Sequence, residues 1–173
     1  TSDGTYGIGD DINITVTTTE AVISNGFQIG VRLDTGASVS TSYATSTTFT
    51  ATYTVGAGEN TSDLDGNSIA SQGINELEDI AGNSTTSLGI SGTSIDDTSA
   101  IVIDGDAPTV TINQDSGQSD PTAASPINFA VVFSESVSDF VTGDVTITGT
   151  AGATTGTVTG SGTTYNVAVS GMT

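Results

Sequence analysis

The side chains of this chain that could do chemistry are its carboxylates. Its 173 residues include 20 Asp and Glu against one basic residue, Arg32, which gives a net charge of −19, and the chain has no Cys and no His. Several carboxylates stand adjacent or one residue apart: Asp10 and Asp11, Asp63 and Asp65, and Asp104 and Asp106. Calcium takes about six to eight oxygen ligands in irregular geometry, whereas zinc and copper favour nitrogen or sulfur. The carboxylate pairs therefore predict calcium as the cofactor.

The same composition excludes several classes of function. With one basic residue the chain has no electrostatic footprint for nucleic acid, and an anionic membrane would repel it. It also has no apolar run long enough for direct membrane insertion. Asp10 and Asp11 could in principle serve a glycosidase as paired carboxylates. However, no His, Lys or Trp is present to complete a site, and only 5% of residues are aromatic, so we expect no enzyme.

Alternating apolar and polar residues predict strands along most of the chain. In residues 12–17, Ile and Val alternate with Asn and Thr, which is typical of a half-buried strand. Further strands are predicted at 27–33, 39–43, 49–55, 69–79 (irregular) and 100–104, with a loop at 56–67 and a turn at 79–83. Abundant Thr, Val and Ile with few Leu favour sheets over helices. The predicted fold class is all-β, with antiparallel β-sandwich modules.

The pattern of residues 12–22 returns 115 residues later. Residues 12–14 (INI) match residues 127–129 (INF), and Val, Glu and Val at 16, 20 and 22 recur at 131, 135 and 137 without a gap. A repeat of this length indicates an array of domains. Residues 1–106 are predicted to form one module that lacks its first strand, the counterpart of 108–115. Residues 107–173 are predicted to form the first half of a second module, so the chain is expected to be a segment of a longer array.

The carboxylates are expected to converge on the hinge at Asp104-Gly105-Asp106. In a sandwich of about seven alternating strands, the loops after odd strands and the end of the last strand gather at one pole. In the first module these loops carry Asp3, Asp10, Asp11, Asp34, Glu59, Asp63 and Asp65. The second module brings Glu135 and Asp139 to the same joint. The predicted calcium ligands are Asp10, Asp11, Asp63, Asp65, Asp104, Asp106, Glu135 and Asp139.

Two local motifs resemble calcium loops but are incomplete. The segment 63–67 (DLDGN) resembles the start of an EF-hand loop, but Ser68 stands where that loop needs Gly and Ile74 where it needs Glu. The segment 7–11 (GIGDD) resembles one turn of a Gly- and Asp-rich β-roll, which needs tandem copies. Neither motif predicts a site by itself.

Longer stretches of the chain carry a family resemblance. They are GTYGIGDDINITVTTTEAV, YTVGAGENTSDLDGNSI, DIAGN, and IVIDGDAPTVTI followed by SPINFAVVFSESV. Together they resemble the bacterial Ig-like, cadherin-like repeats of giant cell-surface adhesins and related surface proteins. The resemblance implies extracellular β-sandwich extender modules in tandem, often with calcium at the joints. It also implies acidic ligands at Asp10, Asp63, Asp65, Asp104 and Asp106, although the D-G-D-A-P linker is shorter and less acidic than the cadherin type.

The favoured expectation is a structural extender with neighbouring repeats as partners and calcium stiffening the joint. Two other roles stay open. One is a self-assembling surface-layer or filament subunit, in which identical subunits complete each incomplete module by strand exchange. The other is a carbohydrate- or protein-binding module with Tyr6, Tyr43 or Tyr165 as contacts.

Overall fold

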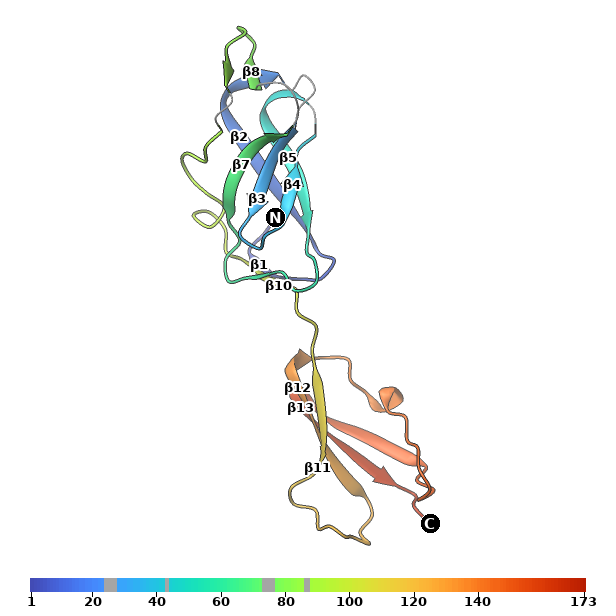
Figure 1. Cartoon of the computed structure of the whole chain (residues 1–173). Helices are drawn as coiled ribbons and strands as arrows, with labels where there is room; N and C mark the ends of the chain where they lie inside the picture. The colour runs from blue at the N-terminus through green and yellow to red at the C-terminus, as the bar shows by residue number, and fades with distance from the viewer. Residues whose placement is uncertain (24–27, 43, 73–76, 86–87) are drawn as a thin grey trace. The chain divides into compact units, whose positions relative to one another are not determined.

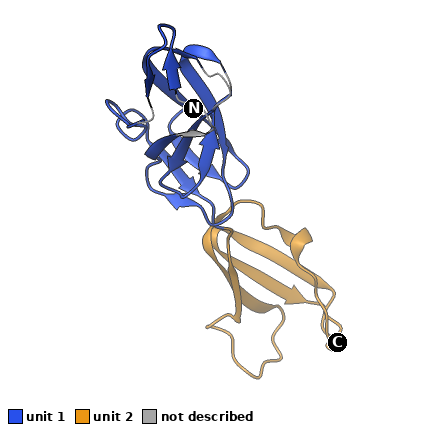
Figure 2. Ribbon diagram, turned by 45° about the horizontal axis from the view of Figure 1, so that its top comes forward, with its two compact units in different colours: residues 1–106 blue, residues 107–173 orange. Residues whose placement is uncertain are grey.

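The structure is a computed structural model that describes residues 1–23, 28–42, 44–72, 77–85 and 88–173. The chain divides into two compact units, Thr1–Asp106 (unit 1) and Ala107–Thr173 (unit 2), shown in Figure 2. The described residues form strands, loops and one short 3-10 helix (Figure 1), so the predicted all-β class is confirmed. Among these residues, no helix is long and apolar enough to cross a membrane.

The described strands of unit 1 form three sheets. The strands are β1 (Gly4–Gly7), β2 (Asp11–Ile23), β3 (Gln28–Leu33), β4 (Ser38–Ser40), β5 (Thr45–Thr54), β6 (Asn60–Thr61), β7 (Gly66–Gln72), β8 (Leu77–Asp79), β9 (Ser84–Thr85) and β10 (Ile101–Asp104). One sheet has the order β5-β2-β8-β9, a second β4-β3-β7 and a third β1-β10-β6.

The core of unit 1 follows from the period-two pattern of its strands. On β2 the Ile and Val side chains at 12, 14 and 16 are buried, while the Asn and Thr side chains between them are exposed. The buried cluster joins residues of several strands: Ile12, Ile14, Val16, Val22, Ile29, Val31, Leu33, Phe49, Tyr53, Val55, Leu64, Leu77, Ile101 and Ile103. Each such side chain contributes roughly 1.5–3 kcal/mol when fully buried, so this cluster holds the sheets together.

The first strand of unit 1, β1, was not predicted. β1 runs parallel to β10, with Gly4 opposite Ile101 and Gly7 opposite Asp104. β1 has two glycines in four residues and no buried side chain, so it carries no apolar alternation. Its strand conformation comes from pairing with a segment far away in the sequence.

Unit 2 is a single antiparallel sheet in the order β11-β12-β13. Its elements are β11 (Val110–Gln114), β12 (Ile127–Val137), the 3-10 helix η1 (Thr142–Asp144) and β13 (Thr155–Ser170). Its core is small and centres on Val131, Tyr165 and Val167. By contrast, Val110 and Ile112 on β11 are 50% and 62% exposed, so one apolar strand remains largely uncovered.

The two units share a strand pair with the same irregularity. β2 pairs with β5 and β12 pairs with β13, both antiparallel. In each pair the register shifts by three positions within the first strand, between Thr17 and Val22 on β2 and between Val132 and Val137 on β12. These positions are 115 residues apart, the spacing of the sequence repeat. A bulge at matching positions supports a common plan for the two units.

The strand boundaries differ from the predicted ones where tertiary pairing decides them. The predicted loop 56–67 contains β6 and the start of β7, and the polar segment after the 79–83 turn begins with β9. The strand expected at 100–104 is β10, and the one expected from residue 12 is β2. Phe27, predicted to start the second strand, and Tyr43 lie outside the described residues.

Candidate functional site

Two of the predicted calcium ligands, Asp10 and Asp104, lie near Gly7 where β10 ends. Asp104 is the last residue of β10 and pairs with Gly7 on β1 and with Asn60 on β6. Asp10 follows the turn after β1, and its Oδ2 accepts a 2.9 Å hydrogen bond from the Gly7 amide. Both carboxylates therefore sit at the same strand end, although the sequence separates them widely.

Asp63 and Asp65 lie beside the start of β10 instead. Asp63 Oδ1 accepts the backbone amide of Ile101 at 3.2 Å. Asp65 Oδ1 accepts the amide of Ile95 at 3.3 Å and also the hydroxyl of Ser94. These two carboxylates thus connect the segment before β7 to β10 and to the loop that precedes it.

The pKa of Asp65 reflects this role. Burial alone would raise it, but the Ser94 hydroxyl and the backbone amides of Gly66, Ile95 and Asp96 lower the pKa below its ordinary value. The donors favour the charged form, since a carboxylate accepts hydrogen bonds more strongly than a carboxylic acid. The contribution of Asp65 to stability is therefore present at neutral pH and is lost as acid protonates it.

The remaining predicted ligands are spread over both units. Asp11 Oδ1 accepts the Thr54 hydroxyl at 2.6 Å across the β2–β5 pair. Asp106 is exposed after β10, and its amide lies 3.4 Å from Asp104 Oδ1. In unit 2, Glu135 is half-buried on β12 and Asp139 is exposed beyond the strand.

Within the described part of the chain, no three Asp or Glu side chains gather closely enough to hold a metal ion. The carboxylates mostly accept backbone amides of nearby loops. Further examples are Asp3 with Ala100, Asp79 with Asn83, Asp97 with Ser94, Asp115 with Gly117, and Asp144 with Val141. In the described residues the arrangement therefore fits loop anchoring better than a ready-made calcium cage.

Tyr53 on β5 and Glu59 in the loop after β5 form a hydrogen-bonded pair. Tyr53 is 2% exposed, and its hydroxyl donates to Glu59 Oε2 at 2.8 Å. The same oxygen accepts the Gly56 amide at 2.7 Å, which closes the loop after β5. Burial and the Glu59 carboxylate raise the pKa of Tyr53 to about 12. Sequence reasoning placed Glu59 in a loop but had no signal for its partner six residues earlier.

This pair predicts a loss of stability in strong alkali. The unfolded chain releases the Tyr53 proton near its ordinary pKa of 10.0, whereas the folded chain holds it to about 12. Stability should therefore fall between these pH values by an amount on the order of 2 kcal/mol. Denaturant unfolding from pH 8 to pH 12 measures it, and Tyr53→Phe should flatten the slope. An unchanged slope in that variant would show that Tyr53 is not the group responsible.

Two of the tyrosines considered as ligand contacts, Tyr6 and Tyr165, have structural partners. Tyr165 is 5% exposed and donates to the Val137 carbonyl at 2.6 Å. Tyr6 packs against the core of unit 1 and donates to the Ser2 carbonyl at 2.7 Å. Tyr165 is therefore too buried to form a recognition platform.

Comparison with known proteins gives no match on which a family could be assigned. No protein-family model matches the chain, and no curated protein shows significant similarity to it.

Proposed function

We propose that this chain is a structural extender segment of a secreted or cell-surface protein, built from tandem Ig-like, cadherin-like modules and working under mechanical load. Neighbouring repeats of the same protein are its partners in this proposal. The observation that carries it is the parallel pairing of β1 with β10, the first and last strands of unit 1.

Parallel terminal strands oppose a pull on the two ends of unit 1. Four residue pairs join β1 to β10, and the Gly4 amide donates to the Ala100 carbonyl at 3.0 Å. Because both strands run in the same direction, a pull on the start of β1 and the end of β10 slides them in opposite directions. All bonds of the ladder are then loaded together instead of opening one at a time. Resistance to forced unfolding is set by the height of the unfolding barrier and not by the equilibrium free energy of unfolding.

The shared strand pair supports the tandem part of the proposal. The first strands of the two pairs, β2 and β12, carry the same three-residue register shift at positions 115 residues apart. Repetition of one structural unit is what an extender needs, since length grows with the number of copies. The cell-surface location rests on the family resemblance of the sequence.

Pulling single molecules by their ends tests the mechanical role. The Gly4 amide faces β10, so by alternation the Tyr6 amide faces β10 and the Thr5 amide faces away. Tyr6→Pro removes one donor from the loaded ladder and should lower the unfolding force of unit 1 by roughly half.

Two matched variants control this experiment. Thr5→Pro places the same ring on the open side of β1, where proline is tolerated, and should keep most of the force. Tyr6→Ala removes the side chain but keeps the amide, and should also keep most of it. Equal loss of force in all three variants would contradict the shear clamp.

Calcium at the linker is the second part of the proposal. Asp104 and Asp106 are both exposed at the end of unit 1, where their carboxylates are accessible to a cation. At ten times its dissociation constant, one calcium ion would add about 1.4 kcal/mol to the stability of the state that binds it. It would also offset part of the repulsion among carboxylates in a chain of charge −19.

Melting in calcium and in chelator measures this effect. We expect calcium to raise the melting temperature of the wild type and the double variant Asp104→Asn, Asp106→Asn to lose that gain. The double variant Asp96→Asn, Asp120→Asn makes the same charge change at two exposed positions and should keep it. An equal response of all three proteins would mean that calcium acts only as a general counterion.

A further inference from the structure

The outer edge of β5 is open among the described residues of unit 1. β5 is the terminal strand of its sheet, whose order is β5-β2-β8-β9, and the described strands pair it with β2 only. The chain continues on both sides of β5, so this edge belongs to the fold of unit 1. An edge strand presents amides and carbonyls that can pair with another chain.

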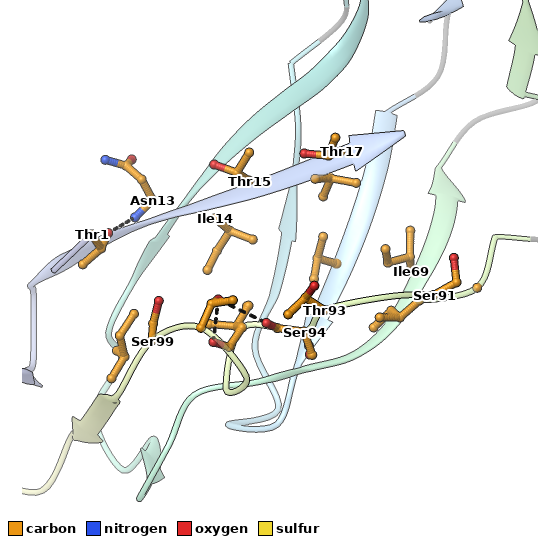
Figure 3. A pocket seen from close by; sticks show the side chains of 18 residues that line it. Thr1, Asn13, Ile14, Thr15, Thr17, Ile69, Ser91, Thr93, Ser94 and Ser99 are labelled. Carbon is orange, nitrogen blue, oxygen red and sulfur yellow. Dashed lines mark hydrogen bonds between the residues drawn. The ribbon is translucent and has the colours of Figure 1, made fainter. Parts of the chain in front are cut away.

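Every second residue of β5 points its backbone groups to this open edge. The Asn13 amide points away from β5, since it donates to Thr1 Oγ1 at 2.8 Å (Figure 3). Asn13 lies opposite Thr52, and two opposed residues of an antiparallel pair point their backbone groups either toward each other or away from each other. The backbone groups of Thr52 therefore face outward, and by alternation those of Thr50 and Thr54 do so as well.

This edge lacks the features that usually keep an exposed strand from pairing. Natural edge strands are protected by charged side chains, by prolines, by bulges or by being short. β5 is ten residues long, and residues 35–58 around it contain no charged residue and no proline. Its register with β2 runs without a shift from Thr48 to Thr54. The Thr48 amide donates to Ser46 Oγ at 3.0 Å, which caps one end of the edge.

The regular stretch of β5, residues 48–54, is nearly palindromic. Its sequence is TFTATYT, in which four Thr alternate with Phe49, Ala51 and Tyr53. The four Thr side chains are exposed, and the three side chains between them are buried. An antiparallel pair of two such strands centred on Ala51 therefore places Thr opposite Thr and an aromatic residue opposite an aromatic residue.

We propose that two copies of this chain associate side by side through the β5 edge, in an antiparallel pair with its two-fold axis at Ala51. Thr50 then lies opposite Thr52 of the second copy, and Thr48 opposite Thr54, so that outward-facing backbone groups bond in pairs. The same patch is used by both copies, as a two-fold dimer requires. No strand leaves its own unit, and the contact does not depend on the mechanical role proposed above.

Charge and sequence favour a second copy as the partner at this edge. Most surfaces of two chains of charge −19 repel one another, whereas the β5 edge lies within the uncharged stretch 35–58. A near-palindrome is needed only by a strand that pairs with itself, and opposed Thr pairs contribute favourable cross-strand contacts. Salt screens the remaining repulsion between the copies, so the dimer should become tighter as the ionic strength rises.

Sedimentation equilibrium of the full chain at low and high salt tests the association. We expect a monomer–dimer equilibrium that is tighter in high salt. Thr52→Pro removes an outward amide near the centre of the pair and should weaken association by about tenfold or more. Thr15→Pro places the same ring on β2, where the amide faces away from β5, and should dimerise as the wild type does. A monomer at every concentration, or equal association of the two variants, would overturn the proposal.

Spin labels test the register without removing a backbone donor. The chain has no Cys, so Thr50→Cys and Thr48→Cys each carry a single label on the exposed face. In the proposed pair the two labelled residues are offset along the strands by two residues in the first variant and by six in the second, or roughly 7 Å and 20 Å. We expect strong dipolar broadening of the spectrum at position 50 and much weaker broadening at position 48. Equal broadening at the two positions, or none at either, would overturn the antiparallel pair centred on Ala51.

Discussion

Replacing Gly105 with alanine should destabilise unit 1 by about 3 kcal/mol. Gly105 is buried between β10 and the loop after β5. Its amide donates to the Glu59 carbonyl at 2.9 Å, and its carbonyl accepts the Gly58 amide at 2.7 Å. A Cβ at this position would lie 2.6 Å from the Glu59 carbonyl oxygen and closer still to that of Gly56. Both are backbone atoms, so the loop itself must move.

Calorimetry or a thermal melt followed by circular dichroism measures this loss, which corresponds to a shift of roughly 10 °C or more. Gly89→Ala is the matched control, because a Cβ there meets nothing within 4 Å. We expect that variant to melt within a degree or two of the wild type. A Gly105→Ala protein that melts as the control does would contradict the close packing of the hinge against the loop.

Tyr165→Ala should unfold unit 2 and leave unit 1 folded. Tyr165 packs edge to face against Phe133 and Phe140, with ring centroids 5.8 Å and 5.2 Å away. Truncating a large buried aromatic side chain costs about 3–5 kcal/mol. Unit 2 has a core centred on only three buried residues, and small domains hold only about 0.05–0.15 kcal/mol per residue in total. The loss therefore approaches the whole stability of the unit.

Amide spectra by NMR separate the two units, since the resonances of residues 107–173 should collapse while those of residues 1–106 persist. Tyr165→Phe keeps the ring and removes only the bond to the Val137 carbonyl, so it should cost about 1 kcal/mol and leave both units folded. Collapse of both units in Tyr165→Ala would mean that they do not fold independently.

The sequence predicted the parts of the fold that depend on local pattern. The alternation at 12–17 marks β2, because one face of that strand is buried against the core. The repeat at 115 residues marks a second strand pair with the same register shift. By contrast, β1 is formed by pairing with β10 and has no apolar pattern of its own. The alternation of apolar and polar residues within a segment cannot reveal a strand that forms only through its pairing partner.

The roles of the carboxylates were likewise only partly predictable from the sequence. Their clustering in loops is visible in the sequence, but their hydrogen-bond partners are not. Asp63 accepts the amide of Ile101 and Asp3 that of Ala100, and these contacts exist only after β10 joins its sheet. A carboxylate that anchors a loop and one that waits for a cation have the same sequence signature, because both need an exposed Asp among turn residues.

Pulling a single wild-type molecule by its two ends tests the mechanical claim most directly, because unit 2 serves as an internal reference. In unit 2 the first and last strands, β11 and β13, lie on either side of β12, whereas β1 and β10 of unit 1 are paired in parallel. The two units differ in length, so their extensions on unfolding, up to about 3.6 Å per residue, identify them. We predict that unit 1 unfolds at a clearly higher force than unit 2. Unfolding of unit 1 at the same force as unit 2, or at a lower one, would show that the β1–β10 pair does not act as a shear clamp.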